Sequence, residues 1–125
     1  MYLKIAYFVC FSGASGDMIL GALMDCGVSI DTFRSELSRL GLEGFRLEAE
    51  RVTKAAIGAI QADVVVDGDH HCEPRTLSSI KALIDSSDLA HEIKERAVQI
   101  FERLGEAEAF VYRVPKEDVH FHEVG

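Results

Sequence analysis

The feature that most constrains this fold is a pair of neighbouring segments in which apolar and polar residues alternate. From Phe45 to Glu50 and from Ile60 to Val66, every second residue is apolar. A period of two is typical of strands with one buried face, because successive side chains of a strand point to opposite sides. The sequence therefore predicts an antiparallel pair of strands that is connected around Lys54 to Gly58.

Apolar residues three and four positions apart flank this pair on both sides and predict four helices. The first opens near Asp17 and is apolar nearly all round, so we expect it to be buried, with Gly27 ending it in the left-handed conformation. Ser29 and Thr76 can cap the second and third helices, and the longer fourth helix starts near Ser87 or Asp88. The expected inward positions are Ile30, Phe33, Leu37 and Leu40 in the second helix, Leu77, Ile80, Leu83 and Ile84 in the third, and Leu89, Ile93, Ala97, Ile100, Leu104, Ala107 and Val111 in the fourth.

Two further strands are expected near the ends of the chain. Residues Leu3 to Cys10 are apolar almost throughout, as in a strand that is buried on both faces, and Val119 to Val124 alternates. The resulting order is β–αα–ββ–αα–β. We predict an α+β fold, a two-layer α/β sandwich with the ferredoxin-like βαββαβ order and doubled helices, in which residues 1–125 form one domain around a mainly antiparallel four-stranded sheet.

Composition excludes several classes of function. The net charge of −8 and the lack of a basic patch argue against nucleic acid as a partner. No apolar run approaches the roughly 20 residues that span a bilayer, so no membrane contact is expected. Three cysteines without close pairing, and an N-terminus that does not look like a signal peptide, favour reduced thiols and a cytoplasmic location.

The loop from Phe11 to Asp17 is the first candidate site. It is rich in glycine and serine and leads from the expected first strand into the first helix, where backbone N–H groups favour an anion such as phosphate. It lacks the lysine of a P-loop, and a tight strand-to-helix turn explains the glycines equally well. Asp17 is well placed to cap the helix.

Two histidine-containing segments are candidate metal sites. In a strand, His120 and His122 point to the same side, and imidazole suits nickel, zinc and copper. His70 and His71 precede Cys72 and Glu73 in a polar loop, which places several donor types in a row. Solvent-exposed histidines on a strand face, and a solvated loop without fixed geometry, are the alternative interpretations.

These segments together resemble a known family. The run from Cys10 to Met18 (CFSGASGDM), followed by Gly21 to Leu23, resembles the opening signature of the LarC-type nickel insertion proteins. The run from His120 to Gly125 (HFHEVG) is similar to their second signature. Between these, Glu50 to Val52, the loop at His70, Arg75 to Leu77 and Glu106 to Ala109 follow in the order seen in the family. The resemblance covers all 125 residues.

The resemblance implies a nickel chelatase, a CTP-dependent cyclometallase of the lyase class. Members place nickel into pyridinium-3,5-bisthiocarboxylic acid mononucleotide, which yields the nickel-pincer nucleotide cofactor of lactate racemase. CTP and a divalent ion, manganese or magnesium, are expected to bind in a C-terminal domain that this chain lacks. We therefore expect residues 1–125 to be an N-terminal fragment that does not insert nickel alone. The lactate racemase apoprotein is a further expected partner, and a homo-oligomer is one option for the assembly.

Roles for single residues follow from combining the resemblance with local chemistry. Ser12, Gly13, Ser15 and Gly16 are expected to hold the phosphate of the mononucleotide. His120, His122, His70 and His71 are the candidate nickel ligands. Asp17, Glu123 or one of the histidines is the candidate general base, and the sequence does not choose among them. A ferredoxin-like strand order would bring the Ser12 to Asp17 loop close to His120 and His122.

Three departures from the family pattern, and two competing functions, remain. Val9 stands where members usually have an acidic residue, the loop at His70 is shorter than the usual His-rich run, and Tyr112 replaces a histidine. A nickel carrier or storage module would use the same histidines but would not bind the nucleotide. A purely structural domain would bind neither ligand.

Overall fold

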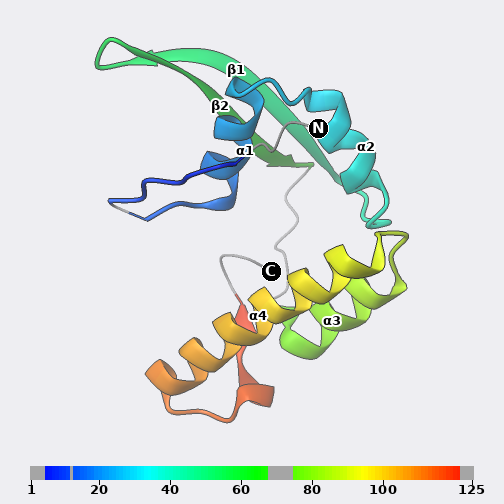
Figure 1. Cartoon of the computed structure of the whole chain (residues 1–125). Helices are drawn as coiled ribbons and strands as arrows, with labels where there is room; N and C mark the ends of the chain where they lie inside the picture. The colour runs from blue at the N-terminus through cyan, green and yellow to red at the C-terminus, as the bar shows by residue number, and fades with distance from the viewer. Residues whose placement is uncertain (1–4, 12, 68–74, 122–125) are drawn as a thin grey trace. The chain divides into compact units, whose positions relative to one another are not determined.

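The computed structural model describes residues 5–11, 13–67 and 75–121 and confirms the mixed α+β class. The elements are α1 (Gly16–Asp25), α2 (Ile30–Ser38), β1 (Phe45–Lys54), β2 (Ile57–Val66), β3 (Arg75–Thr76), α3 (Leu77–Ser86), α4 (His91–Tyr112), η1 (Lys116–Asp118) and β4 (His120–Phe121) (Figure 1). Contacts divide the chain into unit 1, with residues 1–30 and 46–65, and unit 2, with residues 31–45 and 66–125. Each unit is described by itself.

The predicted hairpin is the largest sheet among the described residues. β1 and β2 pair with each other, and Ala55 and Ala56 alone connect them. Both alanines have positive φ, 51° and 64°, as a two-residue turn that matches the right-handed twist of the strands requires. Leu47 and Ala62 are buried on the inner face, at positions that the alternating pattern predicted. The hairpin is therefore confirmed.

Helix α1 packs against this hairpin within unit 1. A Cβ atom at Gly21 would collide with the backbone carbonyl oxygen of Ile60, so only glycine permits this close approach. Gly27 ends the helix with a φ of 104°, and the Val28 N–H donates to the Leu23 carbonyl oxygen at 3.1 Å. The expected burial all round the helix is wrong, because α1 covers the hairpin with one face only and Met18 remains exposed.

The expected first strand is not formed by its described residues. Residues 5–10 have no regular secondary structure, and their side chains are exposed, as for Tyr7 at 87%. A strand requires a neighbour to satisfy its backbone N–H and C=O groups, and no described strand pairs with this segment. The apolar run alone therefore did not determine a strand. The described strands accordingly form two two-stranded sheets, β1–β2 and β3–β4, rather than one sheet of four.

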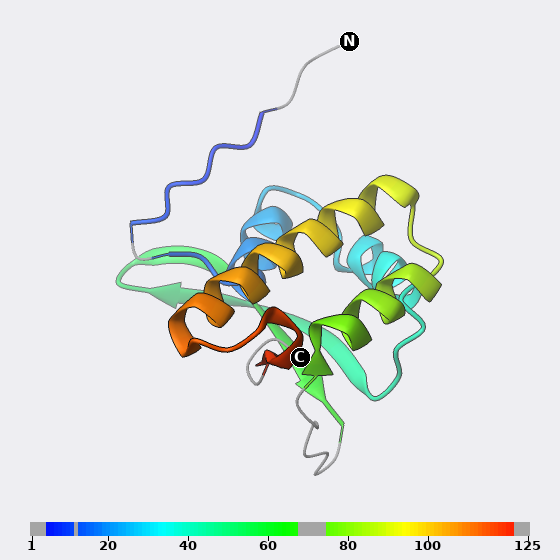
Figure 2. The ribbon, with the colours of Figure 1, turned by 90° about the horizontal axis from the view of Figure 1, so that it is seen from below.

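Unit 2 is built around α3 and α4, which lie side by side in both views (Figures 1 and 2). Thr76 caps α3, because its side-chain oxygen accepts a hydrogen bond from the Ser79 N–H at 3.2 Å. The predicted buried face of α3 is confirmed. Phe121 of β4, and Val119 just before that strand, complete the core. The buried residues of this core are Leu77, Ile80, Ile84, Val119 and Phe121. The predicted inward face of α2 is its least exposed face, although none of its residues is fully buried.

The predicted inward stripe of α4 is partly wrong. Ile93, Ile100 and Val111 are exposed, Ile100 at 67%, whereas Ala97, Val98, Phe101, Leu104 and Ala109 pack against the core. Phe101 lies off the predicted stripe but packs against the core with its aromatic ring. Its ring meets the ring of Phe121 edge to face, with centroids 6.1 Å apart. Gly105 also helps to turn this face of α4 toward the core, because the absence of a side chain leaves room for Leu77 and Phe121.

A charged pair also connects α3 with α4. The Lys81 ammonium group donates to the Glu102 carboxylate, with the nitrogen and oxygen 2.6 Å apart. This hydrogen bond raises the pKa of Lys81 and lowers the pKa of Glu102. Both side chains are more than a third exposed, so solvent screens the ion pair and its contribution to stability is small. No helix in the described part of the chain is both long and apolar enough to cross a membrane.

Candidate functional site

The loop before α1 leads into the N-terminus of that helix in unit 1. Ser15 is the N-cap residue of α1, Gly16 is its first residue, and Gly13 has a φ of 84°. A Cβ atom at Gly13 or Gly16 would meet nothing within 4 Å. Close packing against described residues therefore does not explain these glycines. At the start of the helix, the N–H groups of Asp17 and Met18 donate to the Asp17 carboxylate. Ser12, the remaining predicted phosphate contact, lies outside the described residues.

Asp17 lies in the first turn of α1, where a carboxylate is favoured by the helix dipole. The Ser15 hydroxyl donates a hydrogen bond to this carboxylate, and the N–H groups of Asp17 and Met18 donate as well. Together these bonds hold the pKa of Asp17 below its usual value. Asp17 is therefore ionised at neutral pH, but a carboxylate with a lowered pKa is a weak general base.

His120 lies on a short, well-anchored strand in unit 2. Its neighbour Phe121 is 1% exposed and fixes β4 in the core, while the side chain of His120 itself is exposed. In the β3–β4 ladder, Thr76 is the partner of His120 and Arg75 is the partner of Phe121. Because paired residues share a face of the sheet, Thr76 and His120 lie on one face, and Arg75 and Phe121 lie on the other. The fold thus holds one imidazole at the surface on a fixed backbone.

The same ladder relates the two histidine-containing segments of the sequence. The chain enters β3 at Arg75 and leaves β4 at Phe121, and these two residues are paired. The segment with His70 and His71 precedes the first of them, and the segment with His122 and Glu123 follows the second. These four side chains lie outside the described residues. Both segments nevertheless join the described chain at the same end of one ladder.

The described residues alone do not complete a metal site. Within residues 5–11, 13–67 and 75–121, no three His, Cys, Asp or Glu side chains are grouped as metal ligands. His91, the other described histidine, faces Glu95 on α4 with a nitrogen–oxygen distance of 3.4 Å. Cys10 and Cys26 are free and exposed. The Ser15 loop belongs to unit 1 and His120 belongs to unit 2, so their expected proximity stays a prediction.

A cavity in unit 2 was not foreseen from the sequence. It has a volume of about 320 Å³. Its walls come from the residues before and at the start of β1, the end of β2, β3, and helices α3 and α4. Arg75 and Glu43 are its charged residues. In the sequence, Arg75 belongs only to the family resemblance. A single arginine before a helix forms no pattern that would predict a cavity. The apolar wall residues include Leu42, Phe45, Val66, Ile80, Ile84 and Phe101.

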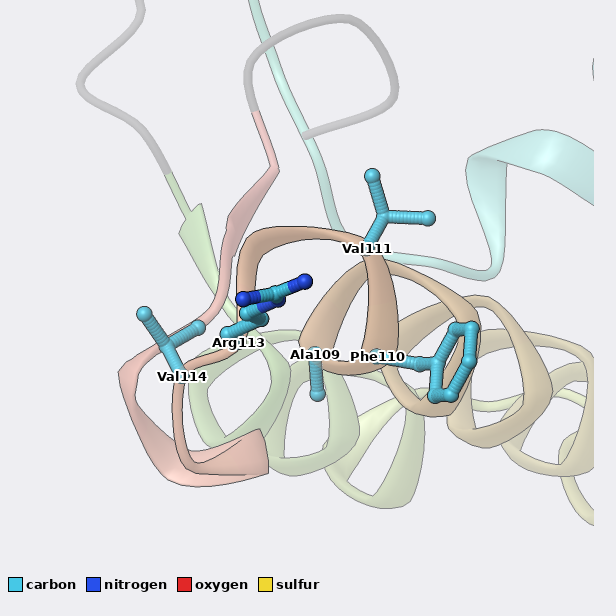
Figure 3. A pocket seen from close by; sticks show the side chains of 5 residues that line it. All are labelled: Ala109, Phe110, Val111, Arg113 and Val114. Atoms are coloured by element: carbon cyan, nitrogen blue, oxygen red, sulfur yellow. The ribbon is translucent and has the colours of Figure 1, made fainter.

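A second hollow, of about 550 Å³, lies at the C-terminal end of α4 (Figure 3). Its lining residues are Ala109, Phe110, Val111, Arg113 and Val114. They all come from one helix end and the residues that follow it, and Phe110 is largely exposed. None of the predicted site residues that the structure describes is among these lining residues, so we assign no ligand to the hollow.

Comparison with known proteins gives a consistent result. A family model described as nickel insertion protein matches residues 6–125. A putative nickel insertion protein of Wolinella succinogenes is 48% identical over 124 residues, which are 98% of this chain and 31% of that protein. Pyridinium-3,5-bisthiocarboxylic acid mononucleotide nickel insertion proteins of Acetivibrio thermocellus and Geobacillus kaustophilus are 43% and 44% identical over 131 residues, with 98% of this chain and 32% of each relative covered.

The chain thus spans about a third of the length of the curated relatives that it matches. The matched residues include the loop before α1, the segment at His70 and the strand at His120. No solved structure matches this chain.

Proposed function

Because this chain belongs to the nickel insertion protein family, we propose that it is the N-terminal part of a protein that inserts nickel into pyridinium-3,5-bisthiocarboxylic acid mononucleotide. The observation that carries this proposal is the similarity across 98% of the chain to relatives named for that reaction. The exposed His120 on the anchored β4 strand supports it from the structure. Nickel and the mononucleotide are both substrates of this reaction.

We assign nickel binding to His120 and His122, with His70 and His71 as further ligands. Neutral imidazole is a suitable ligand for nickel, and ligands from different segments hold a metal best when the backbone fixes the segments together. The Arg75–Phe121 pairing supplies such a connection between the two histidine segments. One ladder thus supports donors that are about 50 residues apart in sequence.

We assign the mononucleotide phosphate to the loop formed by Ser12, Gly13, Ser15 and Gly16. The open space at the Cβ positions of Gly13 and Gly16 supports this assignment. Formation of a nickel–carbon bond replaces a ring proton by the metal, so a base must accept that proton. The lowered pKa of Asp17 makes it the weaker candidate. We therefore favour Glu123 or a histidine of the same segment as the base.

The remaining parts of the proposal concern the complete protein. The product would be the nickel-pincer nucleotide cofactor of lactate racemase, and the racemase apoprotein would be a partner. CTP and manganese or magnesium would bind in the part of the relatives that this chain does not span. Nickel insertion would take place in the cytoplasm, where thiols such as Cys10 and Cys26 stay reduced.

Separate titrations of residues 1–125 with Ni²⁺ and with the mononucleotide test this proposal. We expect the chain to bind both ligands but, in the presence of CTP and Mg²⁺ or Mn²⁺, to yield no nickel-containing product detectable by mass spectrometry. Binding of nickel without the nucleotide would identify a carrier or storage module instead. Binding of neither ligand would indicate a structural domain, and efficient CTP-dependent insertion by residues 1–125 would contradict the need for the rest of the protein.

A further inference from the structure

The cavity in unit 2 is held in shape by the fold around it. Buried Ile80 and Ile84 of α3 contribute to its wall, and Phe101 of α4 adds an aromatic face. Two backbone hydrogen bonds hold the segment that closes its other side. The Asp88 N–H donates to the Arg39 carbonyl oxygen at 2.8 Å, and the Asp67 N–H donates to the Gly44 carbonyl oxygen at 2.7 Å.

Arg75 is the basic residue among the lining residues of this largely apolar cavity. Its side chain is half-buried, and its backbone is fixed by pairing with Phe121. No carboxylate in the described part of the chain forms an ion pair with its guanidinium group, although acidic residues outnumber basic ones by 21 to 13. A guanidinium group presents donors in a fixed planar arrangement that matches a carboxylate-like anion. Glu43 supplies a negative charge on the same cavity.

The substrate named for the relatives has complementary features. A pyridinium ring is flat and positively charged, and the two thiocarboxylate groups on it are anions. The apolar walls can pack against the flat ring. The Arg75 guanidinium group can pair with one thiocarboxylate, and the Glu43 carboxylate complements the positive charge of the ring. Ligand cavities commonly measure about 300–1,000 Å³, so a volume of about 320 Å³ suits the substituted ring better than the entire nucleotide.

We propose that the unit 2 cavity binds the substituted pyridinium ring of the mononucleotide, with Arg75 holding one thiocarboxylate group. This inference rests on the proposed function and names the residue that recognises the ring. The ribose phosphate extends out of the cavity. His120 lies on the other face of the β3–β4 ladder from Arg75, so the proposal concerns binding of the ring and assigns no step of metal transfer to the cavity.

Arg75→Gln tests the role of the guanidinium group, with binding of the mononucleotide measured by calorimetry. We expect the dissociation constant to rise roughly 10- to 100-fold, because hydrogen bonds to charged groups are strong and geometrically specific. Arg75→Lys keeps the charge but loses the planar donors, and its affinity should be intermediate. Arg103→Gln is the matched control, because it removes the same charge from an exposed position of α4 in the same unit.

A second probe separates the ring from the phosphate. Pyridine-3,5-dicarboxylate has a related ring with two anionic groups but no ribose phosphate, so it should compete with the mononucleotide in the wild-type chain. In Arg75→Gln this competition should be lost, while nickel affinity and the melting temperature remain those of the wild type.

The outcomes distinguish this inference from the proposed function. If the wild type binds the mononucleotide and Arg75→Gln binds it equally well, the cavity proposal is overturned while nickel insertion stands. If Arg103→Gln weakens binding as much as Arg75→Gln does, net charge rather than a specific contact is responsible, and the cavity proposal again fails. If the wild type binds nickel but not the mononucleotide, the proposed function fails and the cavity loses its ligand.

Discussion

Nickel affinity should fall about 100-fold or more when His120 and His122 are both replaced by alanine. Loss of a residue that only supports a metal ligand commonly costs about 10- to 100-fold in affinity, and removal of two direct ligands should cost at least as much. The fold should survive, because His120 is exposed and the core contact of β4 is made by Phe121. Competition with a nickel-binding dye, together with circular dichroism of each variant, measures both effects.

His91→Ala is the matched control for this variant. His91 is also an exposed histidine of unit 2, but it lies at the start of α4 beside Glu95 and away from the ladder. Its loss should leave nickel affinity unchanged. Unchanged affinity in the His120→Ala, His122→Ala double variant would move the metal site elsewhere, with His70 and His71 as the next pair to replace.

Replacing Phe121 by alanine should lower the free energy of unfolding by about 3–5 kcal/mol, the usual cost of removing a buried phenylalanine ring. The side chain is 1% exposed, and its ring packs edge to face against Phe101 and beside Gly105. Helix α4 could not close the resulting cavity without giving up its own contacts with α3. Urea denaturation followed by circular dichroism measures the change.

Phe110→Ala provides the comparison for this stability effect. The same kind of side chain is removed from the same unit, but Phe110 is 84% exposed. The free energy of unfolding should therefore change by no more than about 0.5 kcal/mol. Similar losses of unfolding free energy in both variants would contradict the burial of Phe121 in the core of unit 2. A small loss in Phe121→Ala alone would mean that β4 is not anchored by this ring, which would also weaken the case for a fixed position of His120.

Much of the fold could be predicted because periodicity reports which face of an element is buried. The alternation in 45–50 and 60–66 predicted the hairpin, and the spacing of Leu77, Ile80 and Ile84 predicted the buried face of α3. Gly27 was correctly placed as the end of α1, because a positive φ favours glycine strongly. These features depend on local sequence alone.

Features that depend on distant partners could not be predicted in the same way. The apolar run before Cys10 was expected to be a strand, yet hydrophobicity does not supply the neighbouring strand that its backbone requires. The face of α4 was misjudged because Gly105 and Phe101 together create a contact with Phe121 that no local spacing reveals. The cavity at Arg75 brings together segments from residue 40 to residue 101, so its existence follows only from tertiary packing.

The candidate nickel ligands were chosen from residue type and spacing, and the structure adds the ladder that relates their two segments. Arg75 and Phe121 are direct partners, although 46 positions separate them in the sequence. Sequence spacing could suggest His120 and His122 as a pair, because alternate residues of a strand share a face. It could not suggest that the segment with His70 and His71 joins the described chain at Arg75, the ladder partner of Phe121.

X-ray absorption spectroscopy at the nickel edge of the nickel-loaded chain tests most directly whether these histidines bind the metal. We predict imidazole nitrogen ligands in the wild type, seen through the multiple scattering of the rings, and a clear loss of this signal in the His120→Ala, His122→Ala double variant. A nickel environment of oxygen or sulfur atoms without imidazole, or an imidazole signal unchanged by the double substitution, would contradict the assignment.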